Sequence, residues 1–414
     1  MKVLSVSGWI GWCGLWVISW AAGDTLTLEG ALRLALQRNP TLQALRHEID
    51  AAHRQVKSAS RPASMLVLIA PALTAGGSDE ELLLHQPLEW NGARFARTRI
   101  ARAEQKVIHA QALLTLNRVL AEVASAYYEA FYREQIARNA QESLQNTEQV
   151  CELVRQQVEA GARAGIDLVQ AEIERERVRQ HAQLREAEAR QASDRLRVLI
   201  GLPLETQPLV LQAPPTPPDE SVQVGDKGVS PEIIHEQALT HLQEALLHQI
   251  RVEGRPDLGV QVRIERWRGE RTRPAFGLSL QVPFIDYGAR QQQRQAQQER
   301  LNAQRLRLQQ TQRVIMADQR RAHIALETAR ARRDAYRTQI LPRAEQLVQS
   351  TRIGLETGQI TLLQVLEAER TARTVREEAL QAAMELGVAW VEWQRVHGVF
   401  AQRFSQQCLG GDTR

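Results

Sequence analysis

Lysine, aromatic residues and cysteine are scarce in this sequence. Aromatic residues make up 5% of the 414 residues, whereas alanine, leucine, glutamine, arginine and glutamate dominate, a balance typical of long helices. The formal net charge of +4 rests almost wholly on arginines that are interspersed with glutamate and aspartate, as on solvated helix faces. Because nucleic-acid binding requires a segregated basic patch in a recognisable module, we expect no nucleic-acid partner.

Motifs of catalysis and metal binding are also missing. The sequence has no GxSxG, HExxH or P-loop pattern. His235, His241 and His248 fall on one predicted helix, but their gaps of six and seven residues differ from the four-residue spacing that places two ligands on one metal. Cys151 and Cys408 form no CxxC pair. We therefore expect a protein that is not an enzyme, with no catalytic residue, no cofactor and no metal site.

The first 23 residues have the pattern of a secretory signal peptide. Lys2 supplies the positive start, an apolar run covers 3–20, and small residues offer cleavage after Ala21 or after Gly23. An uncleaved anchor helix is the alternative, because the apolar run approaches the ~17–25 residues that span a membrane. Cys13 follows a tryptophan, which fits poorly with the small residue that lipoprotein acylation needs there.

Two segments of the chain repeat at almost the same distance. Residues 155–177 resemble 352–374 at an offset of 197 residues, and 89–94 resemble 285–290 at an offset of 196. Two landmarks nearly in register indicate a duplicated unit. Because 202–218 is rich in proline, we expect neither helix nor paired strand there. The predicted parts are a first structural repeat over 24–201, a proline-rich linker over 202–229, a second repeat over 230–400 and a loose C-terminal tail over 401–414.

Long helices dominate each predicted repeat. Proline is nearly absent from 92–161 and from 288–358, where Pro342 is the exception. An uninterrupted arm of about 69 residues would be roughly 100 Å long. Small and apolar residues recur with 3-4 spacing along 168–199 and again 197 residues later. This repeated phase predicts coiled-coil packing with closely spaced helix axes.

Shorter helices precede each arm. The stretch 26–60 is predicted to be helical with a break before Pro40 and a new start at Thr41, and Pro231 opens its counterpart in the second repeat. The outgoing helix of the second repeat is unusual, because 290–313 is rich in glutamine and arginine and has few apolar anchors. It is either a loosely held, solvated helix or a helix with one face on a water-filled space.

Strands are predicted between these helices, at about 62–90 and 257–284. The second pair alternates apolar and polar residues, as transmembrane barrel strands do when one side faces lipid and the other a wet lumen. The lipid-facing candidates are Val260, Val262, Ile264, Phe276, Leu278, Leu280 and Val282. A half-buried hairpin in a soluble sheet is the alternative. Because open strand edges in lipid leave backbone groups unpaired, four strands that span a membrane require a cyclic, symmetric oligomer.

Segments at 31–56, 86–104, 158–172, 282–296 and 355–369 carry a resemblance to a known family, in strings such as QPLEWNGAR, VEAGARAGIDLVQAE and LETGQITLLQVLEAE. The chain resembles the TolC-like outer-membrane efflux proteins over essentially its whole mature length. It is most similar to the branch that serves heavy-metal (cobalt-zinc-cadmium type) export pumps. The resemblance implies a mainly α fold with a small β part. Duplicated coiled-coil hairpins of a homotrimer would form an α-barrel in the periplasm, and four strands per chain would form a β-barrel in outer-membrane lipid.

The same resemblance implies a passive channel subunit of a tripartite efflux pump. Its helical tips would dock to a periplasmic adaptor protein and an inner-membrane transporter, which we expect to be proton-driven. The tips fall at about 158–166 and 355–363, and the docking candidates are Gly161, Asp167 and Gly358.

Family members often narrow the tunnel mouth with carboxylates just past the second tip. The matching residues are Gln364 and Glu367, of which only one is acidic. In relatives whose mouth is locked by an acidic, an aromatic and a basic residue, the matching positions are Asp167, Leu355 and Ile360. Two of these three side chains cannot make polar links, so this chain departs from the locking pattern, though not from the channel architecture.

Two alternative functions remain open from the sequence. The same channel could serve a type I protein secretion system, from which only the transported substrate would distinguish it. From another class, a soluble periplasmic coiled-coil adaptor would use the same helices but would bury its strands in a protein core.

Overall fold

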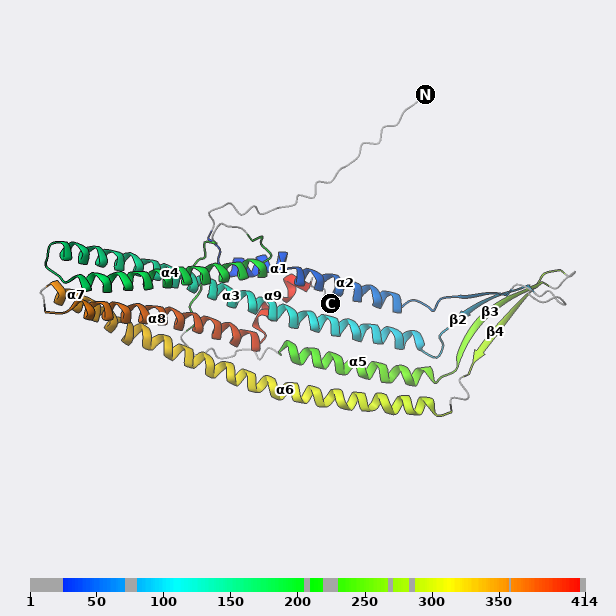
Figure 1. Ribbon diagram of the computed structural model, residues 1–414. Coiled ribbons are helices and arrows are strands. Elements are labelled where there is room, and N and C mark those ends of the chain that lie inside the picture. Colours follow the sequence, from blue (N-terminus) through cyan, green and yellow to red (C-terminus); the bar gives the residue numbers. More distant parts are fainter. Residues whose placement is uncertain are drawn as a thin grey trace, which may run out of the picture.

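The computed structural model describes residues 25–70, 80–204, 209–218, 230–266, 271–282, 287–356 and 359–409. Within them the chain forms two long helical hairpins that lie side by side. A four-stranded sheet lies at the end of the molecule opposite the hairpin turns (Figure 1). No helix in these residues contains a stretch long and apolar enough to cross a membrane. The predicted signal peptide lies outside the described residues.

Each half of the chain contains a helix, two strands, a long outgoing helix and a return helix in this order, with α1 added before the first half and α9 after the second. The first half runs through α1 (Leu28–Arg38), α2 (Pro40–Ala59), β1 (Leu66–Ala70), β2 (Glu80–Pro87), α3 (Ala93–Glu159) and α4 (Gly165–Leu199). The second half runs through α5 (Pro231–Glu253), β3 (Asp257–Arg266), β4 (Arg273–Gln281), α6 (Ala289–Ala335), the π-turn η1 (Tyr336–Ile340), α7 (Leu341–Glu356), α8 (Leu362–Val396) and α9 (Val399–Leu409). The predicted mainly α fold with a small β part is confirmed.

Asn39 separates α1 from α2. Its Oδ1 accepts hydrogen bonds from the backbone N–H groups of Thr41 (2.9 Å) and Leu42 (3.3 Å), and its Nδ2 donates to the carbonyl of Leu199 at 2.8 Å. Pro40 occupies the first helical position, where its missing N–H costs nothing. The predicted break is present, and the new helix begins at Pro40, one residue earlier than expected.

The helix α3 is continuous over 67 residues. It contains neither glycine nor proline, and it is bounded by Gly92 (φ 88°) and Gly161 (φ 73°), both in the left-handed region. The corresponding helix of the second half is interrupted by the π-turn, two residues before Pro342. Proline cannot donate to the carbonyl four residues back, and its ring crowds that carbonyl, so the normal α-helical ladder is disturbed there.

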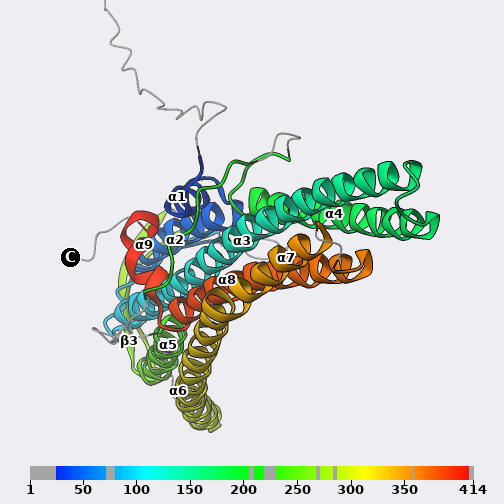
Figure 2. The same ribbon diagram turned by 90° about the vertical axis from the view of Figure 1, so that its left-hand side faces the viewer.

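The main core lies where α1, α9 and α8 contact the middle of α3. Tyr127 and Tyr128 are almost fully buried there. The Tyr127 hydroxyl donates a hydrogen bond either to the carbonyl of Leu26 (2.6 Å) or to that of Gln212 (2.7 Å), and Tyr128 Oη lies 2.8 Å from the carbonyl of Pro215. Seen from the tips, α1 and α9 gather on one side of the helical layer (Figure 2).

The proline-rich linker contacts this core. Leu211 forms an isolated parallel β-bridge with Leu26, in which Leu26 N donates to Val210 O (2.8 Å) and Gln212 N donates to Leu26 O (2.9 Å). The described residues of 202–218 form neither helix nor strand, as predicted, but Leu211 makes this isolated bridge. The hydroxyls of Tyr127 and Tyr128 and the backbone of Leu26 supply hydrogen-bond partners to the linker backbone. Its prolines keep the linker out of regular secondary structure.

The prediction of a loose C-terminal tail is wrong over 401–409, because these residues form most of α9. Phe400 and Phe404 are four residues apart, so both lie on one helix face, and they are buried in the main core. Asn117 of α3 fixes the end of the chain, because its Nδ2 donates to Arg395 O (2.8 Å) and its Oδ1 accepts from Ala401 N (3.3 Å). Residues 410–414 lie outside the described part.

We expect Phe404→Ala to destabilise the protein by about 3 kcal/mol, because it leaves a cavity in the main core. Thermal unfolding of the purified protein in detergent, followed by circular dichroism, measures the loss. Gln402→Ala is the matched control on the exposed face of α9 and should change the free energy of unfolding by less than about 0.5 kcal/mol. Equal effects of the two substitutions would contradict the assignment of α9 to the core.

Candidate channel surfaces

The four strands form one antiparallel sheet in the order β1-β2-β3-β4. The register pairs Val260 with Leu278 and Val262 with Phe276 across β3 and β4, and it pairs Leu84 of β2 with Val262. Directly paired residues share a face. The register therefore brings six of the seven predicted lipid-facing residues onto one face, and Val282 lies just beyond the end of β4.

This apolar face continues across all four strands and is open. Its further members are Val67, Ile69, Leu82, Leu84 and Leu258. Phe276 is 81% and Leu278 79% exposed, so no described element of the chain covers them. A soluble half-buried hairpin would bury these side chains, so the soluble-sheet alternative does not fit.

The opposite face is polar on β3 and β4. It carries Gln261, Arg263, Arg273 and Ser279, and His85 Nε2 lies 2.8 Å from Ser279 Oγ across three strands. Toward the β1 edge this face becomes apolar, with Leu66, Leu68 and Leu83. The first pair of strands therefore alternates less clearly than the second, as its sequence does.

Exposed aromatic residues mark the junction between the sheet and the long helices. Trp90 is 79%, Phe95 78% and Tyr287 97% exposed. Sequence analysis did not single them out, although large aromatic residues beside a membrane-facing strand are typical of the membrane–water boundary. The signal that could have found them was their position at each strand–helix junction.

The glutamine-rich helix α6 is held to α5 by amide hydrogen bonds. Gln297 Nε2 donates to Gln243 Oε1 at 2.7 Å, and Gln304 Nε2 donates to Glu236 Oε2 at 2.6 Å. Both glutamines are buried. Of the two interpretations of this segment, a loosely held helix is therefore wrong, since polar contacts replace apolar anchors along one face while the other stays exposed.

The first tip is closed by a complete Schellman motif. Gly161 N donates to Val158 O and Ala162 N donates to Gln157 O, each at 2.9 Å, while Gly161 adopts φ 73°. Nothing lies within 4 Å of a Cβ built on Gly161, so conformation and not space requires glycine there. Asp167 lies in the first turn of α4, with Oδ2 3.7 Å from Arg163 Nη1.

The second tip is described on either side of Gly358, which itself lies outside the described residues, as does the side chain of Leu355. Thr361 caps α8 through a capping box with Gln364: Gln364 N donates to Thr361 Oγ1 (3.4 Å) and Thr361 N donates to Gln364 Oε1 (2.9 Å). The predicted tunnel-mouth amide therefore also caps its own helix, and Glu367 one turn later is exposed. The side chain of Ile360 packs directly against Gly354, so a Cβ on residue 354 would overlap with Ile360.

Ion pairs and one leucine join the two hairpins near their tips. Arg373 Nη2 of α8 lies 3.0 Å from Glu174 Oε1 of α4, and Leu362 packs into a cluster with Cys151, Val154 and Ala171. The hairpins are thus linked by contacts that involve both halves of the duplication.

Farther from the tips, Glu377 receives two partners from α4. Arg185 Nη2 lies 2.6 Å and His181 Nε2 3.1 Å from its carboxylate. Burial lowers the pKa of His181; Glu377 opposes this, and Arg185 and Arg373 reinforce it. Burial therefore disfavours the charged form of His181, whereas Arg185 carries a permanent charge that pairs with Glu377.

An open apolar sheet at one end, with paired helical hairpins extending from it, is the architecture of an outer-membrane channel subunit with periplasmic helices. Residues 80–202 and 238–398 match the family model described as outer membrane efflux protein, and the chain belongs to this family. The proteins of this family are channel components of efflux systems. The predicted family, fold class and cellular location are confirmed.

Individual relatives agree with this assignment. The cobalt-zinc-cadmium resistance protein CzcC of Cupriavidus metallidurans is 26% identical over 365 residues, which cover 84% of each chain. The CmeC outer membrane channel of Campylobacter jejuni shares the fold with a TM-score of 0.78 at 13% identity, covering 100% of this chain and 98% of that one. CusC shares it with a TM-score of 0.73 at 18% identity, covering 90% and 93%.

We expect Leu278→Arg to block assembly in the outer membrane, because an arginine on the lipid face near the middle of a strand costs about 2–4 kcal/mol. The yield of heat-modifiable oligomer in outer-membrane extracts measures the effect. Gln261→Arg is the matched control, since it lies at a similar depth on the opposite face of the sheet. Normal yield from Leu278→Arg, or an equal loss from both variants, would overturn the orientation of the sheet.

Proposed function

We propose that three copies of this chain form a passive channel that exports heavy-metal cations. A periplasmic adaptor and a proton-driven inner-membrane transporter would deliver the metal to the tips of the helical hairpins. The metal is cargo in this scheme, and the transporter supplies the energy.

The main support for the proposal is the open sheet. Among the described residues, each edge strand, β1 and β4, has a partner on one side only, and the apolar face fits lipid. An unpaired backbone group in lipid costs several kcal/mol. Three copies would supply twelve strands, enough to close a membrane barrel in which β4 of one copy pairs with β1 of the next.

Exposed apolar residues along the helices support the same assembly. They occur on α4, as Ile166, Val169 and Ile173, and on α6, as Leu306, Met316 and Ile324. In one chain these side chains face water, whereas neighbouring copies around an axis would cover such rows.

The tips supply the surface for the adaptor. Gly161 lies in the turn between α3 and α4, and Asp167 lies in the first turn of α4. This turn is at the end of the hairpin that is farthest from the sheet (Figure 1). Gly358 belongs to the second tip by its place in the sequence. The metal cargo is supported by the similarity to CzcC, whose name describes resistance to cobalt, zinc and cadmium.

The proposal is tested in cells that lack their own metal-efflux channel but retain its adaptor and transporter. The chain should restore growth in zinc, cobalt and cadmium. Gly161→Val should abolish this tolerance while oligomers remain, because a β-branched residue at φ 73° is strained by roughly 1–2 kcal/mol and distorts the tip.

Gly165→Ala, at the start of α4, is the control and should retain full tolerance, since Gly165 has no positive φ and open space around it. Tolerance that survives Gly161→Val would show that the tips do not dock. Protein secretion through an ABC exporter without any metal tolerance would favour the type I alternative.

We expect the acidic residue past the second tip to set cation preference. Glu367→Gln should lower the ratio of cation to anion permeability in planar bilayers. Gln364→Glu should raise it without loss of stability, because glutamate serves equally well as the third residue of a capping box. If neither variant changes the ratio, Gln364 and Glu367 do not line the tunnel mouth.

A further inference from the structure

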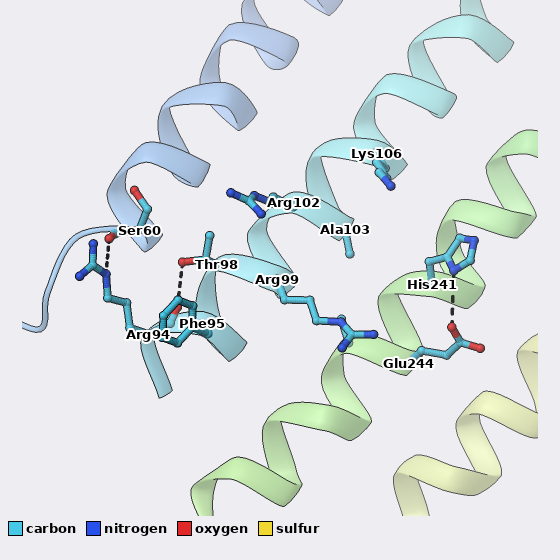
Figure 3. A pocket seen from close by; sticks show the side chains of 11 residues that line it. Ser60, Arg94, Phe95, Thr98, Arg99, Arg102, Ala103, Lys106, His241 and Glu244 are labelled. Carbon is cyan, nitrogen blue, oxygen red and sulfur yellow. Dashed lines mark hydrogen bonds and ion pairs between the residues drawn. The ribbon is translucent and has the colours of Figure 1, made fainter. Parts of the chain in front are cut away.

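A basic cleft of about 730 Å³ lies between α2, α3 and α5 (Figure 3), along the first turns of α3. Phe95, Arg99, Arg102 and Lys106 line it from α3, with spacings of four, three and four residues, so they form one stripe along the helix. Arg94 borders the cleft and donates from Nε to the carbonyl of Ser60 at 2.6 Å. The cleft thus gathers four cationic side chains within three and a half helical turns.

Three of these cations have no partner among the described residues. Arg99, Arg102 and Lys106 make no ion pair or hydrogen bond there, whereas arginines of α4 such as Arg179 and Arg185 pair with glutamates. Glu244 is the carboxylate among the described lining residues, and it lies 3.2 Å from Arg305 Nη2 and 3.4 Å from His241 Nδ1. Its charge is therefore already balanced, and the stripe retains a positive potential.

The positive potential extends along α5. Burial lowers the pKa of His248, and Arg99, Arg255 and Arg251 lower it further. His248 Nδ1 is buried without a hydrogen-bond partner in the described residues. The positive charge here comes from these arginines and not from His248, whose lowered pKa favours the neutral imidazole.

The stripe is not a requirement of the helical architecture. At the 196-residue offset of the repeat, Phe95, Arg99, Arg102 and Lys106 correspond to Gln291, Gln295, Gln298 and Asn302 of α6. The second long helix therefore forms with neutral amides at all four positions. The helix can form without these cations, and their charges repel one another. A bound anion would therefore stabilise them.

The position of the cleft identifies the source of the anion. Phe95, third residue of α3, and Trp90, three residues after β2, are largely exposed, as expected at a membrane boundary. Arg99 lies about 6 Å farther along α3 than Phe95. That rise matches the roughly 5–8 Å between the hydrocarbon edge and the outer limit of the headgroups.

We propose that this cleft binds the phosphate of an anionic phospholipid headgroup from the periplasmic leaflet of the outer membrane. Arg99, Arg102 and Lys106 hold the phosphate oxygens through charge-assisted hydrogen bonds, and Phe95 contacts the start of the acyl chains. The lipid thereby fixes the height of the channel in the membrane.

The test is native mass spectrometry of the purified full-length protein in mild detergent, titrated with dioleoylphosphatidylglycerol or dioleoylphosphatidylcholine. We expect the phosphatidylglycerol to bind at least about tenfold more tightly. Arg99→Gln/Arg102→Gln should remove about tenfold of that preference, since each charge-assisted hydrogen bond contributes on this scale. Arg177→Gln/Arg320→Gln removes the same charge from exposed arginines elsewhere and should leave the preference unchanged.

Phe95→Ser separates a lipid from a free anion. It should weaken phosphatidylglycerol binding while leaving the binding of inorganic phosphate unaltered. Competition by inorganic phosphate at the same concentration as the lipid would overturn the lipid assignment, as would equal affinity for the two lipids. If the double arginine variant fails to assemble, Lys106→Gln serves as the milder substitution, and an unchanged preference in Lys106→Gln would overturn the proposal.

Discussion

Backbone hydrogen bonding in lipid is the constraint on which the rest of this structure depends. The strands β1 to β4 hydrogen-bond to one another, but in the described part of the chain β1 and β4 each leave one edge open. A membrane offers no water to those groups, and this is the physical reason for the proposed barrel of several copies. The apolar face across β3 and β4 fits a lipid environment, and the proposed oligomer would also cover the exposed apolar rows on α4 and α6.

Polar side-chain contacts connect the long helices to their neighbours. Gln297 and Gln304 join α6 to α5, Arg373 and Glu174 join α8 to α4, and Asn117 joins α3 to both sides of the turn into α9. Such contacts depend on direction, so they fix which helices are neighbours and in which rotation. The buried tyrosines Tyr127 and Tyr128 act similarly, because their hydroxyls order the proline-rich linker.

Periodic patterns in the sequence predicted the elements whose stability comes from repetition. The alternation around Val262 and Leu278 located the sheet and its apolar face, and the 3-4 spacing located the hairpins. Sequence patterns missed the features that depend on contacts between segments far apart in the chain. The helix α9 is held by Phe400, Phe404 and Asn117, and two phenylalanines in a polar stretch give no periodic signal. The bridge between Leu26 and Leu211 likewise joins segments that are far apart in the chain.

The π-turn at Tyr336–Ile340 explains a mismatch between the two repeats. They are 196 residues apart where the long helices begin, at Gly92 and Gly288, but 197 apart at Gly161 and Gly358. A π-turn encloses one more residue than an α-turn, so it absorbs an insertion. In α-helical geometry the added residue would rotate all of α7 by about 100°. The second hairpin therefore keeps the phase of the first, with one spare residue folded away partway along its outgoing helix.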